Sequence, residues 1–158
     1  MRTCANAFVS SILILPWITM KVVVIYESTR GRTEAMAKAI CEGVSSNGQE
    51  CEVVNAKDFN GLKGACALAV GSSTRMRKAL PHVRRLLAEM TNLDGIPSAA
   101  FGSYGWSAEA PDTIAEELAE LGGNLLDEQP VKAREMPNRE ELELCRNLGK
   151  RLAASCNS

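Results

Sequence analysis

The sequence has no closely spaced cysteine pair, only one histidine, and few aromatic residues. It holds six cysteines, but no two lie closer than ten residues, so none of the short Cys motifs that bind zinc or iron–sulfur clusters is present. The lone His82 follows Pro81 at a helix start and has no Ser/Asp or Cys partner in a recognisable arrangement. We therefore expect no metal site, no catalytic side chain of these kinds, and reduced cysteines typical of a cytoplasmic protein.

Long hydrophobic runs are also absent. The stretch from Phe8 to Ile18 is too short to cross a bilayer, which takes about 20 apolar residues. It resembles a short signal-peptide core, but no small-residue cleavage site follows it. Met20 stands directly before the first strand pattern. We expect residues 1–19 to be an apolar extension with translation starting at Met20, residues 20–158 to form the domain, and no stable membrane insertion; a membrane-surface anchor is the alternative.

A chain of 158 residues with 46% apolar and 23% charged residues suits one globular domain. Its charges are unevenly distributed: residues 1–85 hold twelve Lys/Arg against six Asp/Glu, whereas residues 109–143 hold eleven acids against three bases. A run without acids contains Arg75, Arg77, Lys78, Arg84 and Arg85. This run could dock an acidic redox partner or the phosphate of a nicotinamide cofactor, or it could be a solvated helix face. Without a nucleic-acid-binding motif or an aromatic platform, nucleic acid is not an expected partner.

Short apolar segments alternate with helical patterns from Met20 onward. Strands are expected at Val22–Tyr26, Glu50–Asn55, Ala65–Val70, Ser98–Phe101 and Leu125–Leu126, the last with or without Val131. Apolar residues at helical spacing fill three of the four intervals and the C-terminal end, from Met36 to Val44, Leu80 to Met90, Ile114 to Leu121 and Leu142 to Leu152. The remaining interval, between the second and third strands, holds only a short connector at Asp58–Leu62. The alternation predicts an α/β fold with a doubly wound, five-stranded parallel sheet and helices on both faces.

In such sheets ligands bind beyond the carboxyl ends of the strands, where the strand order reverses. The first loop at that edge reads E-S-T-R-G-R-T and leads directly into a helix. Its hydroxyls (Ser28, Thr29 and Thr33), a glycine that permits a tight turn (Gly31) and two cations (Arg30 and Arg32) suit a phosphate cradle at a helix N-terminus. A solvated helix cap is the alternative.

Two further loops follow the third and fourth strands. The stretch G-S-S-T-R-M-R-K, from Gly71, has small residues that let the backbone approach a flat ring. The stretch F-G-S-Y-G-W-S, from Phe101, exposes a Tyr and a Trp that are costly to leave uncovered without a ligand or partner, unless they pack on the neighbouring helix. The order of the three loops indicates one mononucleotide lying across the sheet.

With these motifs the chain resembles the flavodoxin family, and it looks closest to the flavodoxin domain of A-type flavoproteins (flavo-diiron proteins). The stretch A-F-G-S-Y-G-W-S is the most specific element; S-x-x-G-x-T and A-V-G-S-S-T are similar as well. The resemblance covers about Met20 to Ala153 and implies strand order 2-1-3-4-5 and non-covalent FMN. We expect no di-iron centre in this sequence, because one histidine cannot supply its ligands.

The resemblance implies that the first loop holds the phosphate and that the other two loops line the two sides of the isoalloxazine. The cofactor-binding candidates are Ser28, Thr29, Arg30, Gly31, Arg32, Thr33, Ser72, Ser73, Thr74, Ser103, Tyr104, Gly105 and Trp106. The expected function is FMN-based electron transfer with protein redox partners. The alternatives are an NAD(P)H-dependent FMN or quinone reductase of the same fold, and a domain that has lost FMN and acts as a binding module.

Overall fold

The computed structural model describes residues 20–127 and 129–156, so the expected extension at residues 1–19 lies outside the described residues. Strands and helices alternate along the chain as the sequence predicts. Their order is β1 (Lys21–Glu27), α2 (Arg32–Ser46), β2 (Glu50–Asn55), the 3-10 turn η1 (Ala56–Asp58), β3 (Ala65–Ser72), α3 (Pro81–Glu89), β4 (Pro97–Tyr104), α4 (Glu109–Glu120), β5 (Asn124–Leu125), β6 (Val131–Arg134) and α5 (Arg139–Ser155).

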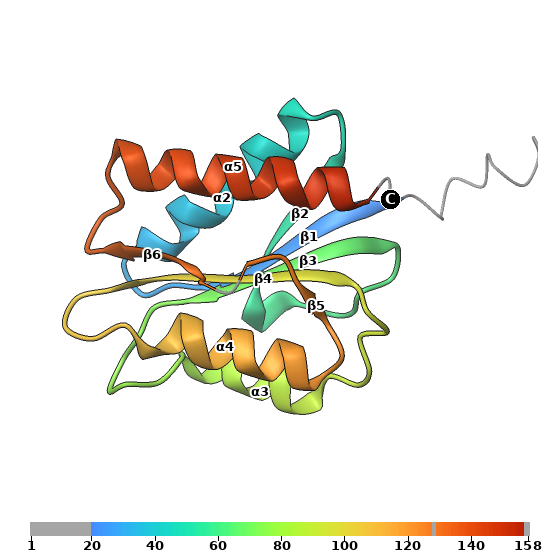
Figure 1. Cartoon of the computed structure of the whole chain (residues 1–158). Coiled ribbons are helices and arrows are strands. Elements are labelled where there is room, and N and C mark those ends of the chain that lie inside the picture. Colours follow the sequence, from blue (N-terminus) through green and yellow to red (C-terminus); the bar gives the residue numbers. More distant parts are fainter. Residues whose placement is uncertain (1–19, 128, 157–158) are drawn as a thin grey trace, which may run out of the picture.

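All strand pairs in the sheet are parallel, and its order is β2-β1-β3-β4-β5, with β6 also paired to β4. Helices α2 and α5 cover one face of the sheet, and α3 and α4 cover the other (Figure 1). The expected doubly wound α/β architecture and the order 2-1-3-4-5 are confirmed. Strand order reverses between β1 and β3, which places the switch point beside the loop that follows β1.

The fifth strand position holds two segments instead of one. β5 pairs with the start of β4 at Pro97 and Ser98, and β6 pairs with its end, from Phe101 to Tyr104. Pro130, just before β6, has no N–H to donate to a strand ladder. Asp127, between β5 and β6, forms an ion pair with Arg151 of α5, with an N···O distance of 2.5 Å. The sequence prediction of Leu125–Leu126 located the first half of this position but treated Val131 only as its extension.

Each face of the sheet has its own apolar core. On the α2/α5 face, β1 contributes Val22 and Val24, and β4 contributes Phe101, whose side chain is fully buried. On the α3/α4 face, β1 contributes Val23 and Ile25. The alternation along β1 therefore feeds both cores, as expected for a central parallel strand.

Helices α2 and α5 cross closely at two glycines. A Cβ on Gly43 would lie 1.9 Å from the carbonyl oxygen of Arg146, and one on Gly149 would lie 1.9 Å from that of Ile40. Only a residue without a side chain fits at either position. The two backbones approach each other at this crossing, which fixes the position of the α2 N-terminus over the sheet.

The cysteines differ from the sequence prediction. Cys41 of α2 is bonded to Cys51 of β2, and Cys66 of β3 is bonded to Cys156 beyond α5, with Cα–Cα distances of 5.6 and 5.1 Å. Spacing along the chain gave no hint of these disulfides because each pair meets only through sheet and helix packing. The prediction of reduced thiols is wrong for these four residues, so a cytoplasmic location loses that support and stays a prediction. Cys145 is free and buried.

Within residues 20–127 and 129–156, we find no helix with the length and hydrophobicity needed to traverse a bilayer.

Candidate functional site

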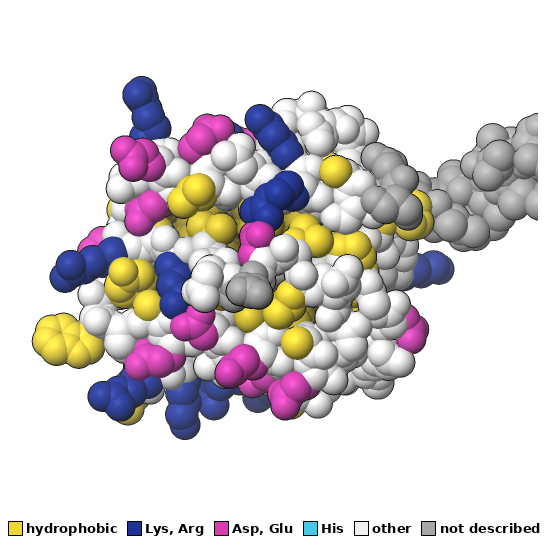
Figure 2. Space-filling model, in the orientation of Figure 1, with side chains coloured by type: hydrophobic (Ala, Val, Ile, Leu, Met, Phe, Trp, Pro, Cys, Tyr) yellow, Lys and Arg dark blue, Asp and Glu magenta, His cyan; other side chains and the backbone are white. Residues whose placement is uncertain are grey.

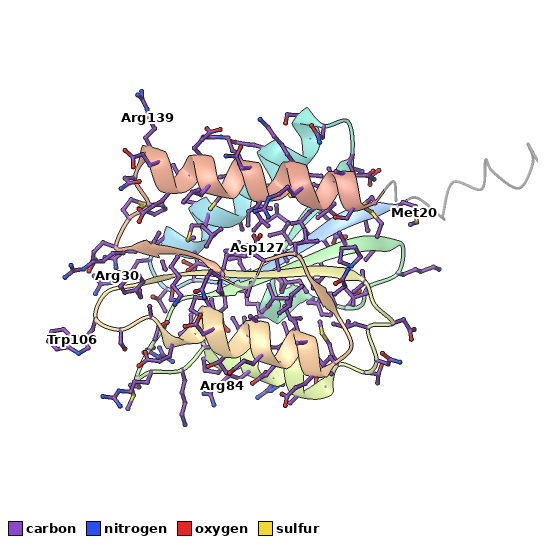
Figure 3. All side chains as sticks on the ribbon, viewed as in Figure 1. Met20, Arg30, Arg84, Trp106, Asp127 and Arg139 are labelled. Carbon is purple, nitrogen blue, oxygen red and sulfur yellow. A yellow bond between two sulfur atoms is a disulfide. The ribbon has the colours of Figure 1, made fainter. Side chains whose placement is uncertain are left out.

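The candidate residues lie at the carboxyl ends of β1, β3 and β4, at the end of the molecule opposite Met20. Figure 3 shows Arg30 and Trp106 on neighbouring loops at this end, and Met20 at the other. Parallel strands end together at one edge, so the three loops predicted from separate parts of the sequence lie side by side.

The loop after β1 forms an open cradle at the head of α2. Gly31 has φ +81°, in the left-handed region that disfavours residues with a side chain, and an added Cβ would meet nothing within 4 Å. No side chain caps the first turn of α2, although Ser28 Oγ accepts a hydrogen bond from Gly31 N at 2.9 Å. Free N–H groups at a helix start, with open space above the glycine, suit an anion.

A cluster of three hydroxyls ties the loops together beneath this cradle. Thr33 Oγ1 lies 3.0 Å from Ser73 Oγ and 2.8 Å from Ser103 Oγ. Thr33 is fully buried and Ser103 nearly so. Because these residues come from α2, the loop after β3 and the end of β4, the cluster holds all three candidate loops in register.

A small hollow of about 90 Å³ opens above the cluster. It is lined by Thr29, Arg30, Arg32, Ser73, Thr74, Ser103, Tyr104 and Gly105, all of which are sequence-predicted candidates. A larger hollow of about 560 Å³ lies between η1 and α3, and none of the candidates lines it. Among the described residues, convergent hydroxyls, cations and an uncapped helix start occur together only at the smaller hollow, which we take as the candidate site.

Five candidates do not line the hollow, and one of them is Gly31, which forms the turn at the head of α2. Ser28 supports the turn at Gly31, and Thr33 lies buried in the hydroxyl cluster. Ser72 is also buried, and its hydroxyl accepts a hydrogen bond from Leu80 N at 2.8 Å. Trp106 is 98% exposed and points away from the body of the protein (Figure 3). Ser28, Thr33 and Ser72 therefore shape the loops, whereas the indole of Trp106 contacts little of the protein.

The two cations of the first loop differ in their surroundings. Arg32 forms an ion pair with Glu135, with an N···O distance of 2.8 Å, whereas Arg30 is exposed and has no carboxylate within 4.0 Å in the described part of the chain. Glu135 lies directly after β6, and its backbone N–H donates to Tyr104 O at 2.7 Å. Sequence reasoning missed Glu135, because its place at the sheet edge becomes visible only once β6 is located.

Glu27 is a second residue that the sequence analysis left unassigned. Its carboxylate accepts a hydrogen bond from Val83 N at 2.9 Å and lies 2.8 Å from His82 Nδ1. Glu27 therefore joins the end of β1 to the first turn of α3. His82 is the exposed helix-start residue that the sequence predicts, and its contact to Glu27 makes it part of the support beneath the first loop.

The fold, with these three loops at its switch point, defines the chain as a doubly wound α/β protein. The family model for flavodoxin matches residues 24–149, and the chain belongs to the flavodoxin family. The resemblance stated from the sequence is confirmed.

Curated relatives match most of this chain. An uncharacterised protein of Methanocaldococcus jannaschii is 36% identical over 142 residues, which are 84% of this chain and 36% of that protein. An anaerobic nitric oxide reductase flavorubredoxin of Escherichia coli is 30% identical over 146 residues, 84% of this chain and 29% of that protein. The chain thus spans about a third of the length of the curated relatives it matches.

Solved structures of flavodoxin-type proteins also superpose on this chain. A flavodoxin from the domain Archaea superposes with a TM-score of 0.81 at 39% identity, covering 88% of this chain and all of that one. The flavodiiron protein of Giardia intestinalis superposes with a TM-score of 0.83 at 28% identity, covering 89% of this chain and 37% of that one. The flavodoxin-like part is what these proteins share with the present chain.

Proposed function

We propose that this chain binds FMN non-covalently at the candidate site and works as an electron carrier. The observation that carries the proposal is the cradle at Gly31. There a left-handed glycine, an uncapped helix start and open space meet a hollow lined by hydroxyls and two arginines. This donor set fits a phosphate monoester, because backbone N–H groups, hydroxyls and guanidinium groups all donate hydrogen bonds to anionic oxygens.

In this proposal Thr29, Gly31 and the N–H groups of the first turn of α2 hold the phosphate, with Arg30 and Arg32 adding charge. Ser73, Thr74, Tyr104 and Gly105 border the ring. The hollow of about 90 Å³ is smaller than sites that enclose a whole small ligand, roughly 300–1,000 Å³. It therefore suits the phosphate end, and the ring would extend over the loops after β3 and β4. Trp106 would cover the ring from the tip of its loop.

The bound flavin would supply the redox chemistry, while the protein sets its orientation and electrostatic surroundings. The buried Thr33–Ser73–Ser103 cluster keeps the three loops at fixed spacing, so the site is formed before a ligand arrives. Exposure of the loops at one end of the molecule leaves the ring edge open to a protein partner.

The first experiment asks whether the purified protein binds flavin. We expect a yellow protein, or a colourless one that takes up added FMN to one equivalent, with the flavin released by acid. If the protein fails to bind FMN at micromolar concentrations, the proposed function is wrong, and only the assignment of the fold and family stands. Steady oxidation of NADPH by the loaded protein with an added quinone would indicate a reductase rather than a carrier.

The second experiment tests the cradle with two glycine variants. Gly31 and Gly48 lie at opposite ends of α2, have φ values of +81° and +77°, and leave an added Cβ in open space. Gly31→Ala and Gly48→Ala should therefore cost similar stability, about 1–2 kcal/mol each. We expect only Gly31→Ala to weaken FMN binding, by about tenfold or more, since distorting this turn moves the N–H groups. Isothermal titration of both apoproteins with FMN measures this, and equal affinities would contradict the cradle.

A further inference from the structure

The loop after β3 ends in a tight hairpin turn, Arg75–Lys78. Arg75 N donates to Lys78 O at 2.8 Å, and Lys78 N donates to Arg75 O at 3.0 Å. The two residues at the tip, Met76 and Arg77, have φ values of +51° and +66°. Side-chain-bearing residues rarely adopt this region, and such conformations cluster at functional sites. The strained turn holds both side chains outward.

The base of this turn is fixed to the candidate site. Thr74 N donates to Ser103 O at 3.1 Å, and Thr74 Oγ1 accepts from Ala110 N at 3.1 Å. On the other side, Ser72 Oγ accepts from Leu80 N at 2.8 Å. The hairpin is therefore a rigid continuation of the loop whose Ser73 and Thr74 line the hollow, and a protein bound to it would lie beside the flavin.

Positive charge gathers on and next to the hairpin. None of Arg75, Arg77, Lys78, Arg84 and Arg85 has a carboxylate within 4.0 Å among residues 20–127 and 129–156, although Arg32, Lys132, Arg146 and Arg151 all do. Lys and Arg side chains line the lower edge of the molecule, over α3 (Figure 2), and Figure 3 places Arg84 there. The Arg84 side chain is held by its Nε–H, which donates to Ala79 O at 3.0 Å.

Helix α4 carries carboxylates on the side that faces this charge. Glu117 borders a hollow of about 280 Å³ together with Arg77 and Arg84. Burial raises the pKa of Glu117, and Glu120 and Glu116 raise it further. A hydrogen bond from Ser107 lowers the pKa of Glu109, and the charge of Arg77 adds to this. In the described part of the chain, none of these α4 carboxylates lies within 4.0 Å of the five cations, so the cations are not paired with them.

An apolar side chain stands at the centre of this charge. Met76 is 88% exposed, and a second hollow of about 220 Å³ beside it is bordered by Arg75, Pro81 and Arg84. A flexible methionine surrounded by cations combines an adaptable apolar contact with long-range attraction. Protein interfaces are enriched in methionine and arginine for these reasons.

We propose that the surface formed by Arg75, Met76, Arg77, Lys78 and Arg84 is the docking site for an acidic electron-carrier protein. That the partner is an electron carrier rests on the proposed FMN function, because the hairpin adjoins the loops proposed to hold the flavin. That the partner is acidic rests only on the unpaired cations of the surface. Met76 packs against the partner while the cations attract its carboxylates. A nucleic acid would be drawn by charge only, and the test below separates the two.

The test measures binding to two probe proteins by titration calorimetry. A plant-type [2Fe–2S] ferredoxin serves as the acidic probe, and cytochrome c serves as the basic one. We expect the ferredoxin to bind, with affinity falling about tenfold or more between 20 and 200 mM salt. We expect cytochrome c to bind more weakly than the ferredoxin. A single-stranded 20-mer DNA that competes with ferredoxin at equal concentration would overturn the proposal.

Variants with matched charge changes locate the surface. Arg75→Gln/Arg77→Asn removes two cations, and asparagine tolerates positive φ, so the turn is kept. Lys63→Gln/Lys150→Gln removes two exposed cations elsewhere. We expect the first pair to weaken ferredoxin binding about tenfold and the second less than twofold; equal losses would overturn the proposal. Met76→Asn, which keeps the charges, should weaken binding without changing its salt dependence.

FMN content is read by absorbance on the same samples. If FMN fails to bind while ferredoxin still recognises the hairpin, the proposed function fails and the docking surface stands. If FMN binds and the hairpin variants leave ferredoxin affinity unchanged, the docking surface fails alone.

Discussion

Among single residues, the ion pair between Arg32 and Glu135 sets the charge of the candidate site. One of the two cations in the first loop is already occupied by a carboxylate at 2.8 Å, which leaves Arg30 as the unpaired charge. The pair is partly exposed, with side-chain exposures of 25% and 55%. It keeps the Arg32 side chain directed at Glu135, and it reduces the positive field at the cradle.

Removing that carboxylate should strengthen anion binding. In Glu135→Gln the guanidinium of Arg32 is released toward a bound phosphate, so we expect FMN affinity to rise about two- to tenfold at low salt. The gain should shrink at 0.5 M salt, since screening weakens charge pairs near the surface. Glu140→Gln, an exposed acid in the first turn of α5, serves as the control. Weaker FMN binding in Glu135→Gln would mean that the carboxylate positions Arg32 for the ligand.

The residues of the first loop could be predicted as site candidates from the sequence, because they lie next to one another in the chain. Hydroxyls, a glycine and two arginines lie within six consecutive positions, from Ser28 to Thr33. The roles within that set could not be predicted, since they depend on contacts across the sheet. Thr33 turns inward to Ser73 and Ser103, and Arg32 turns to Glu135 more than 100 positions away.

Among elements, the crossing of α2 and α5 positions the cradle. The α2 N-terminus can reach the switch point only if the helix lies close to the sheet, and α5 packs over it. Gly43 and Gly149 allow that approach. Helical periodicity in the sequence predicts both helices, but it gives no sign of which residues face each other.

A methyl group at the crossing should separate the helices. In Gly149→Ala the new Cβ would meet the carbonyl oxygen of Ile40 at 1.9 Å and Val44 N at 2.9 Å. The gain in helix propensity, about 1 kcal/mol, is outweighed by backbone overlap, and we expect a net loss of about 2 kcal/mol or more. Asn147→Ala at an exposed α5 position is the control, with a change within about 0.5 kcal/mol. Urea unfolding measures both, and a stabilised Gly149→Ala would show that the helices yield easily.

Strand prediction failed only where the strand is interrupted. Continuous apolar runs predict β1, β3 and β4 because both faces of a central parallel strand are buried. β5 has two residues, and β6 reads Val-Lys-Ala-Arg, with one fully buried side chain, at Ala133. At an edge of the sheet that signal is too weak to detect from one sequence.

Over the whole molecule, two disulfides tie the edges of the fold to its centre. Cys41–Cys51 joins α2 to β2, and Cys66–Cys156 joins β3 to the end of α5, across 90 positions of the chain. Cross-links that close long loops restrict the unfolded chain most. On that model the shorter link is worth about 3 kcal/mol and the longer between about 4 and 5 kcal/mol, as upper values.

Thiol counting and unfolding test these links together. In a Cys4→Ser variant, denatured but unreduced protein should show one thiol, Cys145, whereas the sequence expectation of reduced cysteines gives five. In the native state that thiol should resist alkylation near pH 8, because burial raises the pKa of Cys145 to about 12. Reduction should lower the urea midpoint, and a midpoint that does not move would mean that the links contribute nothing to stability.

The indole of Trp106 stands almost wholly in solvent at the tip of the third loop, and the second tryptophan of the chain is Trp17. After Trp17→Phe, one fluorophore would remain, directly at the end of the molecule where both proposed ligands arrive. Its emission should be red-shifted in the free protein and should shift to the blue or be quenched as that end becomes covered. The molecule thus carries its own optical reporter, which allows occupancy to be followed without an attached dye.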